Sequence, residues 1–447
     1  MKDIIIIGAG PGGYELALKA SKSGLTTLLI EKDNVGGTCL NYGCIPTKSY
    51  YQNAKILNEV KKAENFGITG DFSFDFNKTY KRKEKVVSDL IKGIEYLLNK
   101  ENVEFVKGTA KIVDKNTVQV NNAIYKGKNI VIATGSSSVR LNLPGFDLEG
   151  VIDSTDLLSL QSVPEKLVII GGGVIGIEMA TIFATFGSEV EVIEMCDTIL
   201  PLLDLDISKR LQSYLKQSKI KIHTKSKVTS ITKIEDSEQL TVHYIEKEKE
   251  ETTTASKVLL SIGRKPNLDN LGLDEVGIAY SKKGIVTDDN FKTNIDNIYA
   301  IGDVTGKTML AHSATYSGYH VLNNILGVKD KINFNIVPSC VFTFPEIASI
   351  GLTEEEAKNM NIDYKVSKSM YRASGKAVAM NEVEGFIKVI VSDDKIIGVH
   401  IIGYDASNLI SQVLPLINEN ISIINIKDYI FAHPTLAEIF ANAIHEL

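Results

Sequence analysis

Residues 4–20, IIIIGAGPGGYELALKA, form the stretch that decides the fold. Four consecutive isoleucines are typical of a buried strand, a glycine-rich turn follows at once, and a helical pattern opens at Tyr14. A second apolar strand covers residues 26–30 and ends at Glu31. A strand, a glycine turn, a helix and a strand within about 30 residues predict the βαβ unit of a doubly wound sheet.

This turn has the pattern of a dinucleotide-binding loop. Glycines allow the backbone to turn tightly and to approach a pyrophosphate, whose charge then faces the N-terminus of the helix. Glu31, at the end of the second strand, is placed to accept hydrogen bonds from a ribose. The alternative is a tight strand-helix turn that binds nothing. The candidate cofactor-binding glycines here are Gly8, Gly10, Gly12 and Gly13.

The same unit returns later in the chain. Residues 167–170 form an apolar strand, a helical pattern runs to Phe186, and the following strand ends at Glu194. A carboxylate in the ribose position favours a 2′-hydroxyl and repels a 2′-phosphate, so NAD is expected rather than NADP. Two nucleotide-binding domains are therefore predicted. The glycines of the second turn are Gly171, Gly173 and Gly176.

Length and composition exclude several classes of protein. The 447 residues suggest about three domains, and 49 basic against 55 acidic residues give a formal charge of −6. That balance does not indicate binding to nucleic acid or to a membrane, and the basic run at residues 81–85 is interpreted as a solvated helix face. No apolar run is long enough for a membrane helix, and the N-terminus lacks a signal-peptide core. Residence in the cytoplasm or in an organelle matrix is the expectation, with the cytoplasm preferred.

Two of the four cysteines lie five residues apart in GGTCLNYGCIPTK, residues 36–48. Along a regular helix, Cys39 and Cys44 would be rotated by about 500°, so that a disulfide between them requires a distorted turn. Glycines and a proline supply such a backbone. Buried packing and a metal site are the alternatives, but no other ligands stand nearby at metal spacing. A redox-active disulfide is the better interpretation, and no metal is expected.

One histidine differs from the other six. His433 precedes Pro434, which suits the first position of a helix, and Glu438 would follow one turn inside. A carboxylate on one ring nitrogen sets the tautomer and raises the basicity of the other, which makes the two residues a candidate catalytic base. The remaining cysteines, Cys196 and Cys340, are expected to be ordinary buried thiols.

These motifs, taken in order, resemble those of the flavoprotein pyridine nucleotide-disulfide oxidoreductases, in the form typical of the lipoamide-recycling members. The resemblance covers nearly the whole chain. Beyond the two glycine turns and the cysteine segment, it rests on ATG (133–135), GRKPN (263–267), NIYAIGDVTG (297–306), LAHSATYSG (310–318), VPSCVFTFPEIASIGLTEEEA (337–357) and HPTLAE (433–438). Residues 49–51, SYY, and the LAHSATYSG segment depart from the usual family pattern.

The resemblance implies the fold and the cofactors. It predicts an α/β chain with two Rossmann-like domains, for FAD and NAD, and a C-terminal α+β dimerisation domain. The proposed boundaries are 1–145 for the FAD domain, 146–270 for the NAD domain, 271–335 for a segment that completes the FAD domain, and 336–447 for the dimerisation domain. Gly135, Asp303 and Gly263 are implied as further cofactor-binding residues, with Asp303 near the ribityl-pyrophosphate linkage of FAD.

The resemblance also implies the chemistry. Cys44 would lie next to the flavin and Cys39 would exchange with the substrate, while Lys48 and Glu178 would form an ion pair near the flavin. His433 and Glu438 would act as the base across the interface of a homodimer. The implied reaction oxidises a protein-bound dihydrolipoyl group and reduces NAD+. The partner would be a lipoyl-bearing protein of a 2-oxo acid dehydrogenase complex or a glycine cleavage system. A glutathione or mercuric reductase, or a non-catalytic flavin-binding subunit, are the alternatives.

Overall fold

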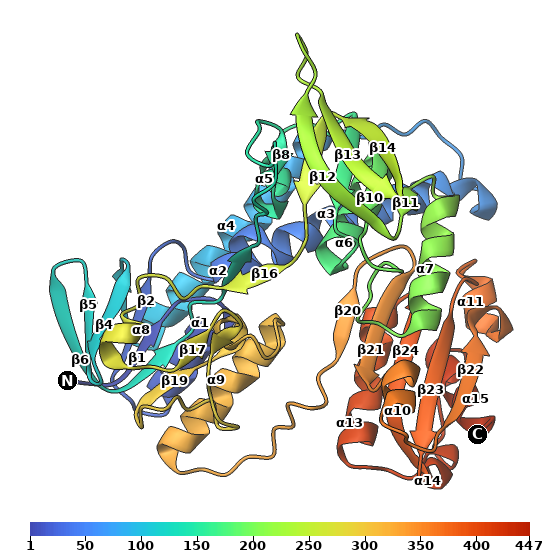
Figure 1. Cartoon of the computed structure of the whole chain (residues 1–447). Helices are drawn as coiled ribbons and strands as arrows, with labels where there is room; N and C mark the ends of the chain where they lie inside the picture. Colours follow the sequence, from blue (N-terminus) through green and yellow to red (C-terminus); the bar gives the residue numbers. More distant parts are fainter.

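The computed structural model describes residues 1–447, and its first sheet contains the first glycine turn (Figure 1). The turn lies between β1 (Lys2–Ile7) and α1 (Pro11–Lys22). The strand order is β3-β2-β1-β6-β5-β4, and β19 (Ile298–Ala300) pairs with β6. A late segment thus completes the sheet, which is compatible with the proposed split of the FAD domain. The other strands are β2 (Thr27–Glu31), β3 (Glu104–Lys107), β4 (Ala110–Asp114), β5 (Thr117–Val120) and β6 (Ala123–Ile132).

The second sheet is entirely parallel and contains the repeated unit, with β9 (Lys166–Ile170) followed by α6 (Val174–Phe186) and β10 (Glu189–Ile193). Its order is β11-β10-β9-β15-β8. Leu167 and Ile169 of β9 lie in a core with α6, whereas Val168 and Ile170 lie in a core with the antiparallel strands named below. Both faces of β9 are therefore buried, which explains why the strand is apolar from residue 167 onward. The remaining strands are β8 (Val151–Ile152), β11 (Lys221–His223), β15 (Lys257–Leu260) and an antiparallel group of β12 (Ser226–Lys233), β13 (Leu240–Glu246) and β14 (Lys249–Ala255).

The C-terminal unit is built on an antiparallel sheet in the order β20-β21-β24-β23-β22. Its strands are β20 (Ser339–Val341), β21 (Glu346–Gly351), β22 (Lys365–Met370), β23 (Phe386–Ser392) and β24 (Lys395–Gly403). Short helices pack against it, among them α10 (Glu354–Asn359), α12 (Ala406–Leu409), α13 (Val413–Asn418), α14 (Ile423–Lys427) and α15 (Ala437–His445). Together with the two parallel units, this confirms the predicted fold class.

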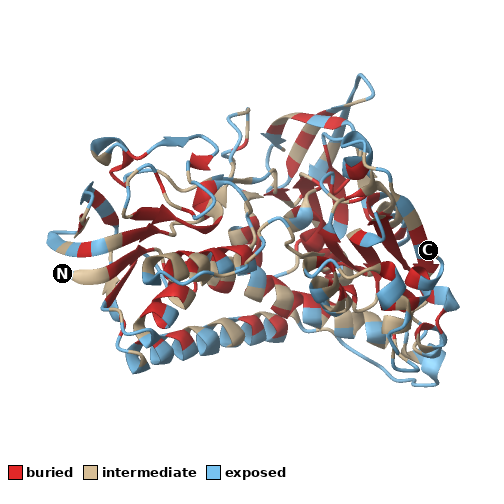
Figure 2. Ribbon diagram, turned by 90° about the horizontal axis from the view of Figure 1, so that it is seen from below, coloured by how far each residue is buried: buried red, intermediate tan, exposed pale blue.

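Helix α3 (Cys44–Lys61) connects the three units (Figure 1). Tyr50 and Tyr51, the departing residues of the SYY segment, are buried in a core that also contains Phe183 of α6 and Ile347 of β21. Tyr51 donates a hydrogen bond of 2.9 Å to the buried Glu346. These two tyrosines therefore hold α3 between the domains through packing. In Figure 2 the central strands are mostly buried, whereas the exposed residues lie on the outer faces of helices and in loops.

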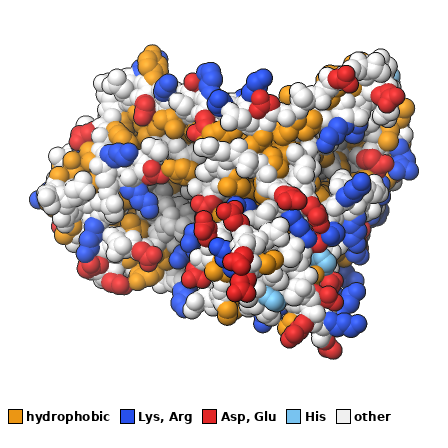
Figure 3. Space-filling view, turned by 90° about the horizontal axis from the view of Figure 1, so that it is seen from above, with side chains coloured by type: hydrophobic (Ala, Val, Ile, Leu, Met, Phe, Trp, Pro, Cys, Tyr) orange, Lys and Arg blue, Asp and Glu red, His pale blue; other side chains and the backbone are white.

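One sequence prediction about the surface is wrong in part. Helix α4 (Phe76–Lys100) carries the basic run, but Lys83 is only 3% exposed. Its Nζ donates a 2.9 Å hydrogen bond to the carbonyl of Leu158 and lies 4.2 Å from the ring centroid of Tyr80. A long aliphatic stem with a partnered ammonium can be buried in this way. Elsewhere, acidic and basic side chains are interspersed, as Figure 3 shows for one face.

No helix in the structure combines the length and the apolar character needed to cross a bilayer.

Candidate active site

The two glycine turns have the same geometry. Gly8 and Gly171 both have a φ of +107°, and a Cβ added to them would lie 2.3 Å from the carbonyl oxygen of Ala133 and 2.5 Å from that of Ser261, respectively. By contrast, a Cβ on Gly10 or Gly173 would meet nothing within 4 Å. Each turn thus packs tightly against its own sheet and leaves open space at the N-terminus of α1 or α6, which suits a pyrophosphate.

The acidic residues that follow the two turns are also held alike. Glu31 accepts hydrogen bonds from the backbone N–H of Ala9 at 2.7 Å and of Asp33 at 2.9 Å. Glu194 accepts them from Gly172 at 2.5 Å and Cys196 at 2.7 Å. Both carboxylates are buried beside the glycine turns. The residues present fit two dinucleotides, one at each turn, with a carboxylate available to each ribose.

Several of the glycines predicted to bind cofactor are needed instead for close packing. A Cβ on Gly12 would lie 3.0 Å from the carbonyl oxygen of Ala314, so Gly12 lets α1 approach α9 (Ala311–Leu326) closely. On Gly13 and Gly176 it would overlap the carbonyl oxygens of Gly8 and Gly171. The LAHSATYSG segment, which departs from the family pattern, forms the start of this α9 contact.

The cysteine pair lies across a break between two helices. Cys39 is within α2 (Gly37–Tyr42), and Cys44 is the first residue of α3. Between them Gly43 has φ −138° and ψ −107°, which is not helical, so the backbone turn that the spacing required is present. Both thiols are reduced in the structure, and Cys39 donates a hydrogen bond to the sulfur of Cys44.

That hydrogen bond makes the two sulfurs unequal. It lowers the pKa of Cys44 to about 7, and the positive charge of Lys48 acts in the same direction, against the opposing effect of burial. The pKa of Cys39 is raised, because its proton is engaged by Cys44 and because the site is desolvated. Cys44 is therefore the thiolate of the reduced pair and the better leaving group when a disulfide is attacked.

The lowered pKa has a measurable consequence. In the reduced protein, the rate of Cys44 alkylation should rise with a midpoint near pH 7, because only the thiolate reacts and a lowered pKa populates it at lower pH. The alkylation rate is measured at each pH by mass spectrometry of the peptide that contains Cys44. Lys48→Met should move the midpoint upward. A wild-type midpoint at the ordinary thiol value, about 9, would contradict the assignment.

Lys48 and Glu178 form the ion pair that the sequence predicted as neighbours. The Lys48 Nζ lies 2.9 and 2.8 Å from the two carboxylate oxygens of Glu178, which is 4% exposed. Phe342 completes the arrangement, because its N–H donates to Glu178 at 2.9 Å and its ring centroid lies 4.4 Å from the Lys48 Nζ. Sequence reasoning missed Phe342, whose backbone contact leaves no signal in the sequence.

Asp303 is held by residues that sequence reasoning also missed. The hydroxyl of Ser136 donates to Asp303 at 2.5 Å, and Arg264 donates to both the hydroxyl and the carbonyl of Ser136, at 2.8 and 2.7 Å. Gly135 and Gly263, both with positive φ, flank this contact and face open space. The GRKPN motif contains β16 (Arg264–Pro266), which pairs with β7 (Ser136–Ser138), the strand that directly follows the ATG motif, beside Asp303.

His433 and Glu438 are brought together as expected. The Nδ1 of His433 lies 2.8 Å from Oε1 of Glu438, whose Oε2 accepts the N–H of Thr435 at 2.9 Å. The hydrogen bonds from His433 and Thr435 lower the pKa of Glu438 below its usual value. With Nδ1 donating to the carboxylate, Nε2 is the free nitrogen, and the imidazole is 77% exposed.

The helix start differs from the prediction. Pro434 is not the first helical residue, because α15 begins three positions later at Ala437, and the His433–Pro434 peptide bond is cis. The bends at residues 433–435 and the turn at Leu436 bring His433 back onto the first turn of α15. Within one chain the dyad and the cysteine pair are not brought together, since α15 lies in the C-terminal unit, away from α2 near the middle of the molecule (Figure 1).

The predictions for the two remaining cysteines have different outcomes. Cys340 is partly buried, but Cys196 is exposed, so the expectation of two buried thiols is wrong for Cys196. Cys196 is exposed because it lies in the irregular loop that follows β10. Its backbone N–H donates a hydrogen bond to Glu194.

Comparisons with known proteins agree with this geometry. Residues 2–318 match the family model described as pyridine nucleotide-disulphide oxidoreductase, and residues 337–444 match its dimerisation domain. The chain is 39% identical to a dihydrolipoyl dehydrogenase of Bacillus subtilis and 40% identical to one of Chlamydia muridarum, over 99% of this chain and 97% and 96% of theirs. The structure of the HOCl-induced flavoprotein disulfide reductase RclA from Escherichia coli is similar with a TM-score of 0.89, 30% identity and 99% coverage of both chains.

The family brings FAD and NAD as cofactors, and the two glycine turns with their carboxylates fit that pair. The expected oxidoreductase class is confirmed as well. With two family models covering both parts of the chain and relatives aligned over its whole length, this chain belongs to the pyridine nucleotide-disulphide oxidoreductase family.

Proposed function

We propose that the chain is a dihydrolipoyl dehydrogenase, which oxidises protein-bound dihydrolipoyl groups with Cys39 and Cys44 and passes the electrons to NAD+. The observation that carries the proposal is the His433–Glu438 hydrogen bond, which leaves a free imidazole nitrogen on a chain that also holds an unequal thiol pair. A dithiol substrate needs such a base, because the thiolate and not the thiol attacks a disulfide. The full-length dihydrolipoyl dehydrogenase relatives support the same substrate.

In the proposed reaction the Cys39–Cys44 pair begins as a disulfide. His433 takes a proton from one substrate thiol at Nε2, and the resulting thiolate attacks Cys39, so that Cys44 leaves as the thiolate. The second substrate thiol then loses its proton and attacks the mixed disulfide, and the sulfur of Cys39 leaves and takes up that proton. The cyclic substrate disulfide is released, and the chain then holds a Cys39 thiol, a Cys44 thiolate and a protonated His433. Two electrons and two protons have left the substrate. Bound FAD supplies a two-electron carrier between the dithiol and NAD+.

The chain's other residues have supporting roles in this proposal. Glu438 orients His433 and stabilises the imidazolium that forms. Lys48, held by Glu178 and Phe342, supplies a positive charge near the Cys44 thiolate. Gly8, Gly10 and Glu31 bind FAD at the first turn, and Asp303 binds it beside Ser136; Gly171, Gly173 and Glu194 bind NAD at the second turn.

The base and the thiols lie on separate parts of the chain, so we propose a homodimer in which each subunit supplies His433 to the cysteine pair of the other. The matched dimerisation domain supports this arrangement. The natural partner would be a lipoyl-bearing protein of a 2-oxo acid dehydrogenase complex or a glycine cleavage system, and the proposed location is the cytoplasm.

A substrate panel tests the proposal. The FAD-loaded protein is assayed with NADH and NADPH against lipoamide, oxidised glutathione and coenzyme A disulfide. The expected result is rapid reduction of lipoamide with NADH and much slower reduction with the other pairs. Preferred reduction of glutathione with NADPH would instead indicate a glutathione-type reductase, and no disulfide reduction at all would contradict an enzyme of this class.

The nucleotide preference rests on Glu194. Glu194→Arg should lower kcat/KM for NAD+ by at least about tenfold, because the variant loses the carboxylate for the ribose and both backbone hydrogen bonds to Gly172 and Cys196. The ratio of NAD+ to NADP+ efficiency should fall with it. Glu31→Gln, at the matching position of the other turn, should change FAD retention instead. Unchanged NAD+ kinetics in Glu194→Arg would refute the ribose role.

A further inference from the structure

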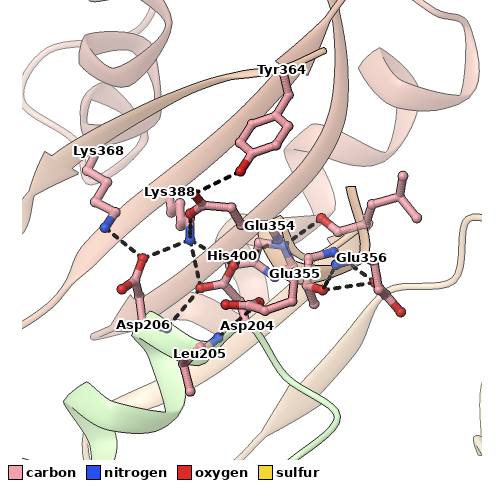
Figure 4. A network of polar contacts seen from close by, with 12 residues as sticks. Asp204, Leu205, Asp206, Glu354, Glu355, Glu356, Tyr364, Lys368, Lys388 and His400 are labelled. Carbon is pink, nitrogen blue, oxygen red and sulfur yellow. Dashed lines mark hydrogen bonds and ion pairs between the residues drawn. The ribbon is translucent and has the colours of Figure 1, made fainter. Parts of the chain in front are cut away.

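A buried cluster of charges joins the NAD-binding unit to the dimerisation domain (Figure 4). Lys388, on β23, and Asp204, just before α7 (Leu205–Gln217), are both 0% exposed. The Lys388 Nζ lies 3.0 and 2.9 Å from the two carboxylate oxygens of Asp204, 2.7 Å from Asp206 and 2.5 Å from Glu354. Burial alone would lower the pKa of Lys388, but these three carboxylates raise it, so the ammonium stays charged.

The carboxylate of Asp204 is bonded on all sides. Besides Lys388, it accepts the N–H of Asp206 at 3.1 Å, which caps the start of α7, and the N–H of Glu354 at 3.2 Å. Glu354 is the first residue of α10 in the dimerisation domain. One side chain thus ties the first turns of two helices from different domains to the same point, and loss of the Lys388 charge would leave Asp204 buried without a charged partner.

Asp204 also ends the loop that packs on the second glycine turn, residues 195–203. The loop has no regular secondary structure, and its start is bonded to Glu194 through the N–H of Cys196. In its middle, the N–H of Leu200 donates to the carbonyl of Gly172 at 2.8 Å, and Leu200 has a φ of +48°. Ile199 lies against Gly172, where an added Cβ would be 3.1 Å from its Cγ2.

The loop is held from two sides. On one side are the glycine turn and Glu194, which carry the proposed NAD contacts, together with the N–H of Lys225, which donates to the carbonyl of Cys196 at 2.9 Å. On the other side is Asp204 with the first turn of α7, where the hydroxyl of Ser208 donates to the carbonyl of Leu200 at 3.1 Å. Because an irregular segment with a positive φ at a leucine lacks regular backbone bonding of its own, its conformation depends on such anchors. A change at Asp204 that shifts the start of α7 would therefore be passed through Ser208 to Leu200, whose N–H is bonded to Gly172.

We propose that Asp204 and Lys388 are positioning residues for NAD, which fix the 195–203 loop against the second glycine turn and so couple the dimerisation domain to nucleotide affinity. This inference rests on the proposed NAD site at Gly171–Gly173 and Glu194. It assigns to the dimerisation domain a task in nucleotide binding in addition to supplying His433.

The test is a direct measurement of NADH binding to the FAD-loaded protein by calorimetry. Asp204→Asn should raise the Kd for NADH at least about fivefold, the lower end of ordinary coupling between sites. The double variant Asp204→Asn/Lys388→Met, which removes both charges of this pair, should do the same. FAD content and the rate at which dihydrolipoamide reduces the Cys39–Cys44 disulfide should stay at wild-type values, since neither involves the loop. A Kd within twofold of wild type in the folded double variant overturns the proposal.

Lys368→Met is the matched control. Lys368 pairs with Asp206 at 2.7 Å at the rim of the cluster, is the cross-strand neighbour of Lys388, and does not contact Asp204. Its replacement should leave the Kd unchanged, and a Kd raised as much as in the Asp204 variants would contradict the specific role of the Asp204 anchor. A wild-type protein that binds no NADH would contradict the NAD site itself, which distinguishes failure of the proposed function from failure of this inference.

A second measurement uses the wild-type protein alone and does not depend on how well variants fold. If the anchors favour NADH binding, NADH must in turn stabilise the anchors, because coupling between sites is reciprocal. Hydrogen exchange at the N–H of Glu354, which is bonded to Asp204, should therefore slow when NADH is added. Equal exchange with and without saturating NADH would overturn the coupling.

Discussion

Replacing His433 with glutamine should lower kcat for dihydrolipoamide oxidation by about 10²- to 10⁴-fold, the usual contribution of a general base. Glutamine keeps much of the size and can still donate to Glu438, but it has no basic nitrogen in place of Nε2. The substrate thiol would then have to lose its proton to water. Steady-state assays across pH should also show that the remaining activity rises with the substrate's own thiolate fraction, because no protein group assists ionisation.

Three controls separate loss of the base from loss of structure. His312→Gln changes another exposed histidine, which is bonded through Nε2 to the carbonyl of Pro338, and should retain activity. Glu438→Gln should have a smaller effect than His433→Gln, since the imidazole remains but loses its orientation. Electron transfer from NADH to ferricyanide bypasses the dithiol and should be unchanged in His433→Gln. Dihydrolipoamide oxidation within threefold of wild type in that variant would remove His433 from the mechanism.

Replacing either active cysteine with serine should abolish dihydrolipoamide oxidation, by at least about 10⁴-fold, because a hydroxyl cannot form the disulfide that receives the substrate's electrons. The two variants should differ in another respect. Cys44→Ser retains the exchange sulfur, and its Cys39 thiolate should attack the disulfide of oxidised lipoamide to give a mixed disulfide and one free lipoyl thiol. Cys39→Ser retains Cys44, the sulfur proposed to lie next to the flavin, and the serine hydroxyl can still donate a hydrogen bond to it.

Mass spectrometry of the trapped species and visible spectra measure this difference. In the FAD-loaded protein, only a variant that keeps Cys44 should show the long-wavelength absorption of a thiolate beside oxidised flavin. Cys340→Ser is the matched control and should stay active. A mixed disulfide found at Cys44 in the Cys39→Ser variant, with none at Cys39 in Cys44→Ser, would reverse the two assigned roles.

The parts of the site that could be predicted from sequence are those made by residues close together in the chain. The glycine turns have to follow a buried strand and open a helix, so their elements could be placed well, and the predicted end of α6 at Phe186 agrees with the structure. The break at Gly43 followed from the five-residue spacing of the cysteines, which a regular helix could not bridge.

The parts that could not be predicted depend on contacts between distant residues. Asp204 and Lys388 are 184 positions apart, and Glu178 and Phe342 are 164 apart, so neither pair leaves a local pattern. The charged neighbours of Lys83 in the sequence predict a surface residue. Its burial depends on the Leu158 carbonyl, which only the tertiary fold brings close. Pro434 suits a helix start by its own geometry, yet α15 begins only at Ala437.

The central claim is that Cys39 and Cys44 exchange two electrons with a dithiol, and counting alkylated cysteines tests it most directly. The FAD-loaded protein is denatured and alkylated before and after one equivalent of dihydrolipoamide per subunit, without NAD+ and without oxygen. Of the four cysteines, only Cys196 and Cys340 should react in the oxidised protein. After the substrate, Cys39 and Cys44 should react as well, and lipoamide should be released. The account would be contradicted if all four cysteines react before the substrate is added. It would also be contradicted if the substrate leaves a Cys39–Cys44 disulfide intact.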